Sequence, residues 1–183
     1  MTLTRRHLLG RGIGLAGGAA LPASLVSANT ALAQASDETD ALEPIVELEQ
    51  AADLAYSLAA EDGDLDREAQ EAFELFAAHC DDHAVALGEA LDQLGVDPPD
   101  RQSDPADYER LADFRANAPQ RELIDFMIAL EEELVTAYEA ATPELEAPDL
   151  VRTAAQVGAS HAQVLVALRL LAGDRPPTPA DLP

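Results

Sequence analysis

Four ionisable residues occur at matching places in the two halves of this sequence. Glu49 and Glu131 lie on apolar helical stripes and stand at the same spacing before a tyrosine, and His83 and His161 are followed by Ala, Leu and Gly at the same spacings. Carboxylates and imidazoles bind transition metals, and imidazole also exchanges protons near neutral pH. The paired pattern predicts one interior site to which each half contributes a glutamate and a histidine.

Two interpretations of these residues use the same geometry. A buried carboxylate is costly unless it is paired, coordinated or protonated, so two glutamates at matching buried positions need a shared reason. One reason is metal ligation. The other is a hydrogen-bonded network in which Glu49 and Glu131 bind the two histidines and one or both of Tyr56 and Tyr138.

Cys80 precedes His83 by one helical turn and could complete a single-ion site for zinc or copper, made of a thiolate, two imidazoles and a carboxylate. The alternative is a buried cysteine that acts as a small apolar residue. His79 and His83, at i and i+4, could chelate a metal, or His79 could be a partly exposed residue beside Asp81 and Asp82. As the single cysteine, Cys80 excludes an intramolecular disulfide framework and every zinc motif with several cysteines.

The elements that must position these side chains are all helical. Apolar residues recur every three or four positions in four segments, and no segment has the alternating pattern of a strand. The segments are residues 41–62, 64–95, 120–142 and 149–172. A proline-rich stretch, 96–119, contains a short helical piece near 108–114 and predicts a long crossover, and Gly95 is expected to cap the second helix. The sequence predicts an all-α fold of two repeated hairpins.

Two similar hairpins joined by one long connection resemble the ferritin-like superfamily, which includes ferritins and rubrerythrins, over about residues 41–173. In that family each hairpin supplies a Glu from its first helix and a Glu-x-x-His from its second, and together these residues hold two irons. On this resemblance, the metal-ligand positions are taken by Glu49, Glu131, His83 and His161.

The sequence departs from the family at two metal-ligand positions. The glutamate expected three residues before each histidine is replaced by Cys80 in one half and by Gly158 in the other. Because those carboxylates bridge the two irons in the family, we expect no di-iron centre. Gly158 is expected to leave space, and the site is expected to hold at most one transition-metal ion, which is iron, zinc or copper if any is bound.

The first 35 residues have the pattern of a signal peptide: no acid, three arginines near the start, a weakly apolar Gly- and Ala-rich run, and small residues at the end. The start, Thr4-Arg5-Arg6-His7-Leu8-Leu9, resembles a twin-arginine export motif. We therefore expect a signal at 1–35, a bundle at 36–173 and a proline-rich tail at 174–183. The expected location is extracellular or at the cell surface, or periplasmic if the source has an outer membrane. The alternative is a signal kept as a membrane anchor.

The net charge of the chain limits the kinds of partner that it can bind. The net charge is −24, and removal of residues 1–35 would leave 8 arginines against 35 acids, a charge of −27. Lysine is absent, and this acidic composition resembles that of proteins from extreme halophiles; an acidic protein from a high-GC mesophile is the alternative. An acidic surface excludes binding along nucleic-acid phosphates, which needs a basic face.

Two classes of function follow from the sequence. The first is an exported ferritin-like protein with a degenerate interior metal site, which serves as a structural or interaction module and has a homo-oligomer or a cell-surface component as partner. The second is a metal-binding ferritin-like protein that stores or oxidises iron or holds one transition metal. No phosphate-binding loop or nucleophile motif is present, which favours a protein that is not an enzyme.

Overall fold

The protein is described here as a computed structural model that covers residues 23–174, with side chains from residue 36 onward. Four long helices carry the fold: α1 (Ala23–Asp62), α2 (Arg67–Leu94), α3 (Gln120–Ala141) and α4 (Pro148–Leu171). Three single-turn helices lie between them, η1 (Pro105–Asp107), η2 (Glu109–Leu111) and η3 (Thr142–Glu144). Residues 23–174 contain no strand, and the predicted all-α class is confirmed.

The ends of the repeated helices match the sequence pattern. Asp66 caps α2, because its side chain accepts a hydrogen bond from the backbone N–H of Ala69 at 2.9 Å. Gly95 and Gly173 follow α2 and α4 with φ of 83° and 85°, a left-handed conformation that only glycine adopts without strain. The two hairpins therefore end in the same way.

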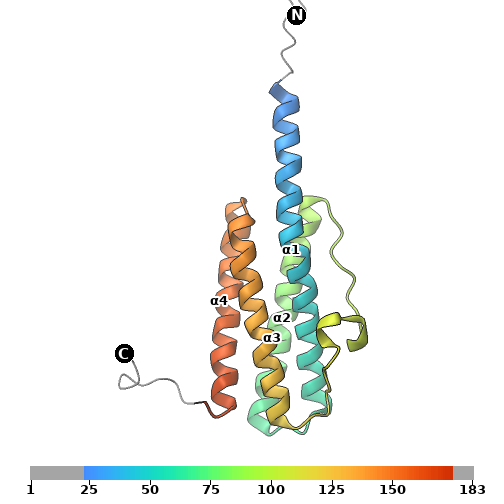
Figure 1. The fold of residues 1–183 in the computed structure, drawn as a ribbon, viewed down its shortest axis with the longest axis vertical. Helices are drawn as coiled ribbons and strands as arrows, with labels where there is room; N and C mark the ends of the chain where they lie inside the picture. Colours follow the sequence, from blue (N-terminus) through green and yellow to red (C-terminus); the bar gives the residue numbers. More distant parts are fainter. Residues whose placement is uncertain (1–22, 175–183) are drawn as a thin grey trace, which may run out of the picture.

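Helix α1 differs from the sequence prediction at its start. It begins at Ala23 rather than near residue 41, so it runs through the expected signal-cleavage zone without a break. It also passes through Pro44, which is tolerated because Pro44 and Asp40 are exposed and water can bind the carbonyl that has lost its helical donor. The first turns of α1 project beyond the other helices (Figure 1).

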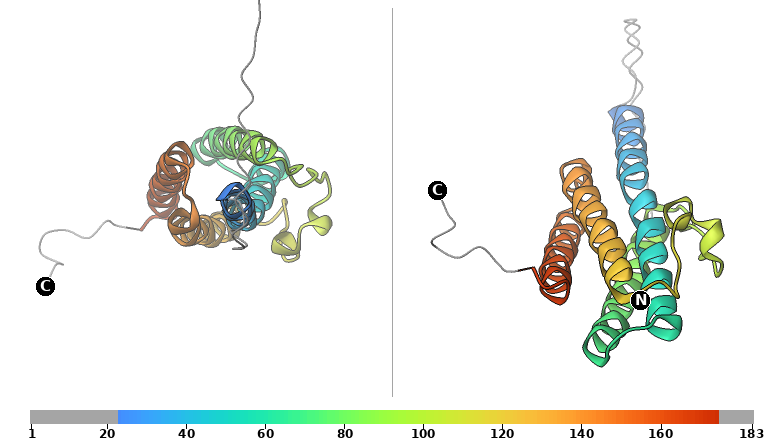
Figure 2. Two further views of the ribbon diagram at one scale, coloured as in Figure 1. Left: turned by 90° about the horizontal axis from the view of Figure 1, so that it is seen from above. Right: turned by 60° about the horizontal axis from the view of Figure 1, so that its bottom comes forward.

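The helices form two hairpins around one core. Helix α1 packs along α2 and α3 packs along α4, while α1 against α3 makes the main contact between the hairpins. Seen from above, the four helices surround a common axis and the crossover lies outside α1 (Figure 2). The predicted stripes of the first and third helices are entirely buried: Leu42, Ile45, Glu49, Ala52, Tyr56 and Ala59 on α1, and Ile124, Met127, Glu131, Leu134, Tyr138 and Ala141 on α3.

The crossover is fastened to α1 by polar contacts. The side chain of Gln50 donates to the carbonyl of Pro99 at 3.0 Å and accepts from the hydroxyl of Tyr108 at 3.3 Å. Arg101 pairs with both Asp53 on α1 and Asp81 on α2. Within the predicted helical piece near residues 108–114 only the short turn η2 is present, and Tyr108 and Leu111 of this piece pack into the core.

Glu38 joins the start of the bundle to the far hairpin. This buried carboxylate on α1 accepts hydrogen bonds from the backbone N–H groups of Glu146 and Ala147, both at 2.8 Å. Those groups lie at the start of α4, which has no side-chain cap of its own. A carboxylate from α1 therefore supplies the charge that a helix N-terminus favours.

The helices of the described segment lack the features of a membrane-spanning helix. Within residues 23–174, no helix combines the length and the apolar character that a bilayer-spanning segment needs. The start of the expected signal, residues 1–22, and the expected tail from residue 175 lie outside the described residues.

Candidate functional site

At the centre of the bundle, one histidine lies between two glutamates from the two hairpins. His161 Nδ1 lies 2.8 Å from Glu131 Oε2, and His161 Nε2 lies 2.7 Å from Glu49 Oε1. All three side chains are buried, with at most 1% of the histidine exposed. Because both ring nitrogens face carboxylate oxygens, the contacts favour a doubly protonated, positively charged imidazole.

Two tyrosines complete this network by crossing between the hairpins. Tyr56 on α1 donates its hydroxyl hydrogen to Glu131 on α3 at 2.8 Å, and Tyr138 on α3 donates to Glu49 on α1 at 2.6 Å. The internal repeat explains why each tyrosine binds the glutamate of the other hairpin, because each helix carries its glutamate and its tyrosine on one stripe, two turns apart. The hydrogen-bonded network expected from the sequence is therefore present for one of the two histidines, His161, and it uses both tyrosines.

The network fixes the ionisation of its members. Burial by itself would lower the pKa of His161, but the hydrogen bonds and charges of Glu131 and Glu49 outweigh it and raise the pKa to about 9. Burial would raise the pKa of Glu49, but the hydrogen bond from His161 and the charges of His161 and His83 lower it. Burial and the charge of a neighbouring glutamate raise the pKa of Tyr56 and of Tyr138, which keeps both phenols neutral.

The two histidines of the repeat are not equivalent in space. His83 Nδ1 lies 3.4 Å from Glu49 Oε1, an ion-pair distance without hydrogen-bond geometry, and the His83 side chain keeps 17% of its surface exposed. Its ring centre lies 5.0 Å from that of His161 at a steep angle. The sequence predicted the position of His83 at the site, but not that His161 alone would bind both glutamates.

Cys80 lies in the same interior. One donor atom each from Glu49, Cys80 and His161 lie within 4.8 Å of one another, and all three residues are buried. Burial and the charges of the two network glutamates raise the pKa of the thiol well above its usual value, which keeps it protonated. His79 lies outside this group, although its ring centre is 6.4 Å from that of His83.

Gly158 lies close against Tyr138, so the space expected from the sequence is not found on that side, although the residue also lines a surface pocket between α3 and α4. A Cβ atom at Gly158 would lie 3.0 Å from the Cβ of Tyr138 and 3.5 Å from the first ring carbon. The ring of Tyr138 also stacks on His161, with ring centres 5.6 Å apart. The tyrosine therefore occupies the room that a glutamate at residue 158 would need, and glycine allows α3 and α4 to approach closely.

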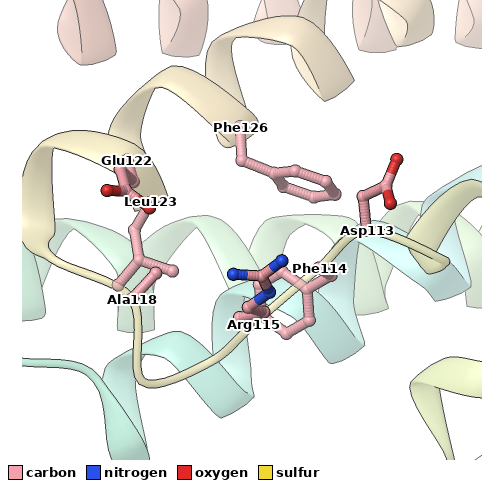
Figure 3. A pocket seen from close by; sticks show the side chains of 7 residues that line it. All are labelled: Asp113, Phe114, Arg115, Ala118, Glu122, Leu123 and Phe126. Atoms are coloured by element: carbon pink, nitrogen blue, oxygen red, sulfur yellow. The ribbon is translucent and has the colours of Figure 1, made fainter.

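A surface pocket at the end of the crossover is separate from this network (Figure 3). Its lining includes Phe114 from the crossover and Phe126 from α3, whose ring centres lie 5.3 Å apart. The remaining lining residues are Asp113, Arg115, Ala118, Glu122 and Leu123. None of them belongs to the network, so the chemistry of the interior does not open into this pocket.

Comparison with known proteins agrees with the fold. The family model for the ferritin-like domain matches residues 37–174. The chain belongs to the ferritin-like family. No curated protein and no solved structure matches the chain significantly. Family membership supports the resemblance on which the positions of the four repeated residues were predicted.

Proposed function

We propose that the protein is an exported ferritin-like module without di-iron chemistry, in which a charged hydrogen-bonded network takes the place of the two irons. The observation that carries the proposal is the placement of His161 between Glu49 and Glu131, with both ring nitrogens in use. The network connects α1, α3 and α4, so it serves to hold the two hairpins in register. This role is structural, and it leaves the outer surface for interaction.

The residues present do not fit two irons. Both oxygens of Glu131 already have a hydrogen-bond partner, Tyr56 on one and His161 on the other. Gly158 offers no ligand, and the Tyr138 ring fills the space beside it. Two irons need carboxylates shared between them, and the positions for these carboxylates hold a thiol and a glycine.

Metal analysis of natively purified protein tests the proposal. The protein, produced in iron-replete medium, is expected to contain at most one transition-metal ion per chain and to lack oxo-bridged iron absorption. Elemental analysis and the visible spectrum measure both properties. Two irons per chain with that absorption would overturn the proposal.

The proposed export rests on Arg5 and Arg6 ahead of a weak apolar run. Because twin-arginine recognition requires the arginine pair, the double variant Arg5→Lys, Arg6→Lys is expected to accumulate as precursor inside the cell, while Arg11→Lys is expected to be exported as a matched control. Immunoblots of cell and extracellular or periplasmic fractions measure the outcome. Normal export of the double variant would refute the twin-arginine route.

The proposed halophilic origin rests on the charge of −27 that remains after residue 35 and on the absence of lysine. At roughly 1 M salt the Debye length falls to about 3 Å, which screens the repulsion between surface acids. The thermal unfolding midpoint is therefore expected to rise steeply from low to molar potassium chloride. A midpoint that is flat over this range would contradict a halophilic adaptation.

A further inference from the structure

We infer that the interior binds a single zinc-class divalent ion through Cys80, Glu49 and His161, with His83 as the fourth ligand and Glu131 as a positioning residue outside the coordination shell. This inference goes beyond the proposed function, because a single ion without bridging carboxylates is compatible with a protein that lacks di-iron chemistry. It also divides the five residues predicted from the sequence into four ligands and one orienting group.

The first observation is an unpartnered oxygen in the core. Glu49 is fully buried, and its Oε2 has no hydrogen-bond partner within the described part of the chain. Leaving a buried carboxylate oxygen unsatisfied is costly, and a cation would relieve that cost. The Nδ1 atom of His83 is also buried without a hydrogen-bond partner. Two orphaned donor atoms therefore belong to residues around the same point.

The second observation is the distance between donor atoms. Donor atoms of Glu49, Cys80 and His161 lie within 4.8 Å of one another. Zinc bonds of about 2.0–2.3 Å in a tetrahedron place ligand atoms roughly 3.3–3.8 Å apart. The donor atoms are therefore close to the spacing of a zinc site, and the 2.7 Å contact between His161 and Glu49 opens as the ion replaces its hydrogen. When the ion binds, the thiol hydrogen and the hydrogen on Nε2 leave as protons to solvent.

Glu131 is placed to orient the histidine rather than to bind the ion. Once Nε2 of His161 holds the metal, Nδ1–H still donates to Glu131 Oε2 at 2.8 Å. This carboxylate–histidine–metal arrangement fixes the tautomer and the ring orientation of a ligating imidazole. Glu131 is itself held in place by the hydroxyl of Tyr56, which donates to its other oxygen.

The donor set selects the kind of ion. One thiolate, two imidazoles and one carboxylate suit zinc or another borderline ion, whereas calcium and magnesium need mainly oxygen ligands. Solvent reaches this set at His83, whose side chain is 17% exposed, and the chain's charge of −24 attracts cations toward that opening.

Cobalt titration of the full chain, first freed of metal by a chelator, tests the inference. Co²⁺ is the probe because it takes tetrahedral zinc sites and reports thiolate ligation by a charge-transfer band in the near ultraviolet. One Co²⁺ per chain with this band and with tetrahedral visible bands is expected, and added Zn²⁺ should displace it. Since Cys80 is the single cysteine, no other residue can give the band.

Variants separate the ligands from the positioning residue. Glu131→Gln is expected to keep both sets of bands while cobalt binds about 10–100-fold more weakly, which is the usual cost of losing an outer partner. Cys80→Ala and His161→Gln are expected to weaken cobalt binding by a larger factor than Glu131→Gln does. Cys80→Ala is also expected to lose the near-ultraviolet band. Circular dichroism confirms that each variant is folded. Glu47→Gln, an exposed residue on α1, is the matched control and should bind as the unaltered chain does.

The other possible results of the cobalt titration and the metal analysis each overturn one specific claim. No cobalt binding, or binding that Cys80→Ala leaves unchanged, would overturn the metal site but not the proposed absence of di-iron chemistry. Loss of the band in Glu131→Gln would overturn the positioning role of Glu131. Two irons in the natural protein would overturn the proposed function, and the cobalt titration would still decide whether Cys80 is a ligand.

Discussion

His161→Ala is expected to lower the free energy of unfolding by about 3–5 kcal/mol, as removal of one partner from a buried ion pair does. The substitution leaves Glu49 and Glu131 facing one another in the core without the imidazolium between them. Urea unfolding followed by circular dichroism, at neutral pH on metal-free protein, measures the loss. Because small domains are stable by only about 5–15 kcal/mol, the effect is a large share of the total.

The internal repeat supplies a matched control for this prediction. His83→Ala removes the equivalent histidine, which makes no hydrogen bond to Glu49 and is partly exposed, so we expect a smaller loss than for His161→Ala. Adding Glu49→Gln to His161→Ala should recover part of the lost stability, because it removes one of two like charges. If the single variant His161→Ala does not fold, the double variant still allows the stability to be measured. Equal losses for the two histidines would contradict the asymmetry of the network.

Between pH 6 and pH 9, the free energy of unfolding is expected to fall by about 3 kcal/mol. The pKa of His161 is raised from 6.5 to about 9 in the folded protein, and one unit corresponds to about 1.4 kcal/mol. A raised pKa stabilises the fold fully below pH 6.5, and this stabilisation is lost as the pH rises through 9. On the acid side the sign reverses, because the pKa of Glu49 is lowered from 4.5, so its contribution is lost as the pH falls through its folded-state pKa.

Two measurements check this pH dependence on metal-free protein. Urea midpoints at pH 6, 7.5 and 9 give the slope, to which the raised pKa of the Cys80 thiol also contributes near pH 9, because the thiol ionises in the unfolded chain. Nuclear magnetic resonance of the imidazole carbons assigns the titration to His161, for which we expect a midpoint near 9. A midpoint near 6.5, together with a flat stability profile, would show that the carboxylates do not hold the proton.

The sequence by itself determined the bundle and the positions of the site residues. Helical periodicity and the glycines at residues 95 and 173 predicted where α2 and α4 end, because they act through local backbone geometry. The repeat predicted that Glu49 and Glu131 lie at equivalent buried positions, since a charged residue on an apolar stripe stands out without any knowledge of its partner. The start of α1 at Ala23 could not be read in this way, because the stripe marks only the part that packs on other helices.

Tertiary structure decided which partner each residue takes. Glu49 meets His161, far away in the chain, and the tyrosines cross between hairpins, which depends on how α1 and α3 face one another. The two halves carry the same motif, but only His161 lies between the carboxylates while His83 remains at the edge. Gly158 became informative only when the ring of Tyr138 was found against it. Spacing fixes the stripe on which a side chain lies, whereas the packing of four helices fixes which side chains meet, and that packing depends on every contact at once.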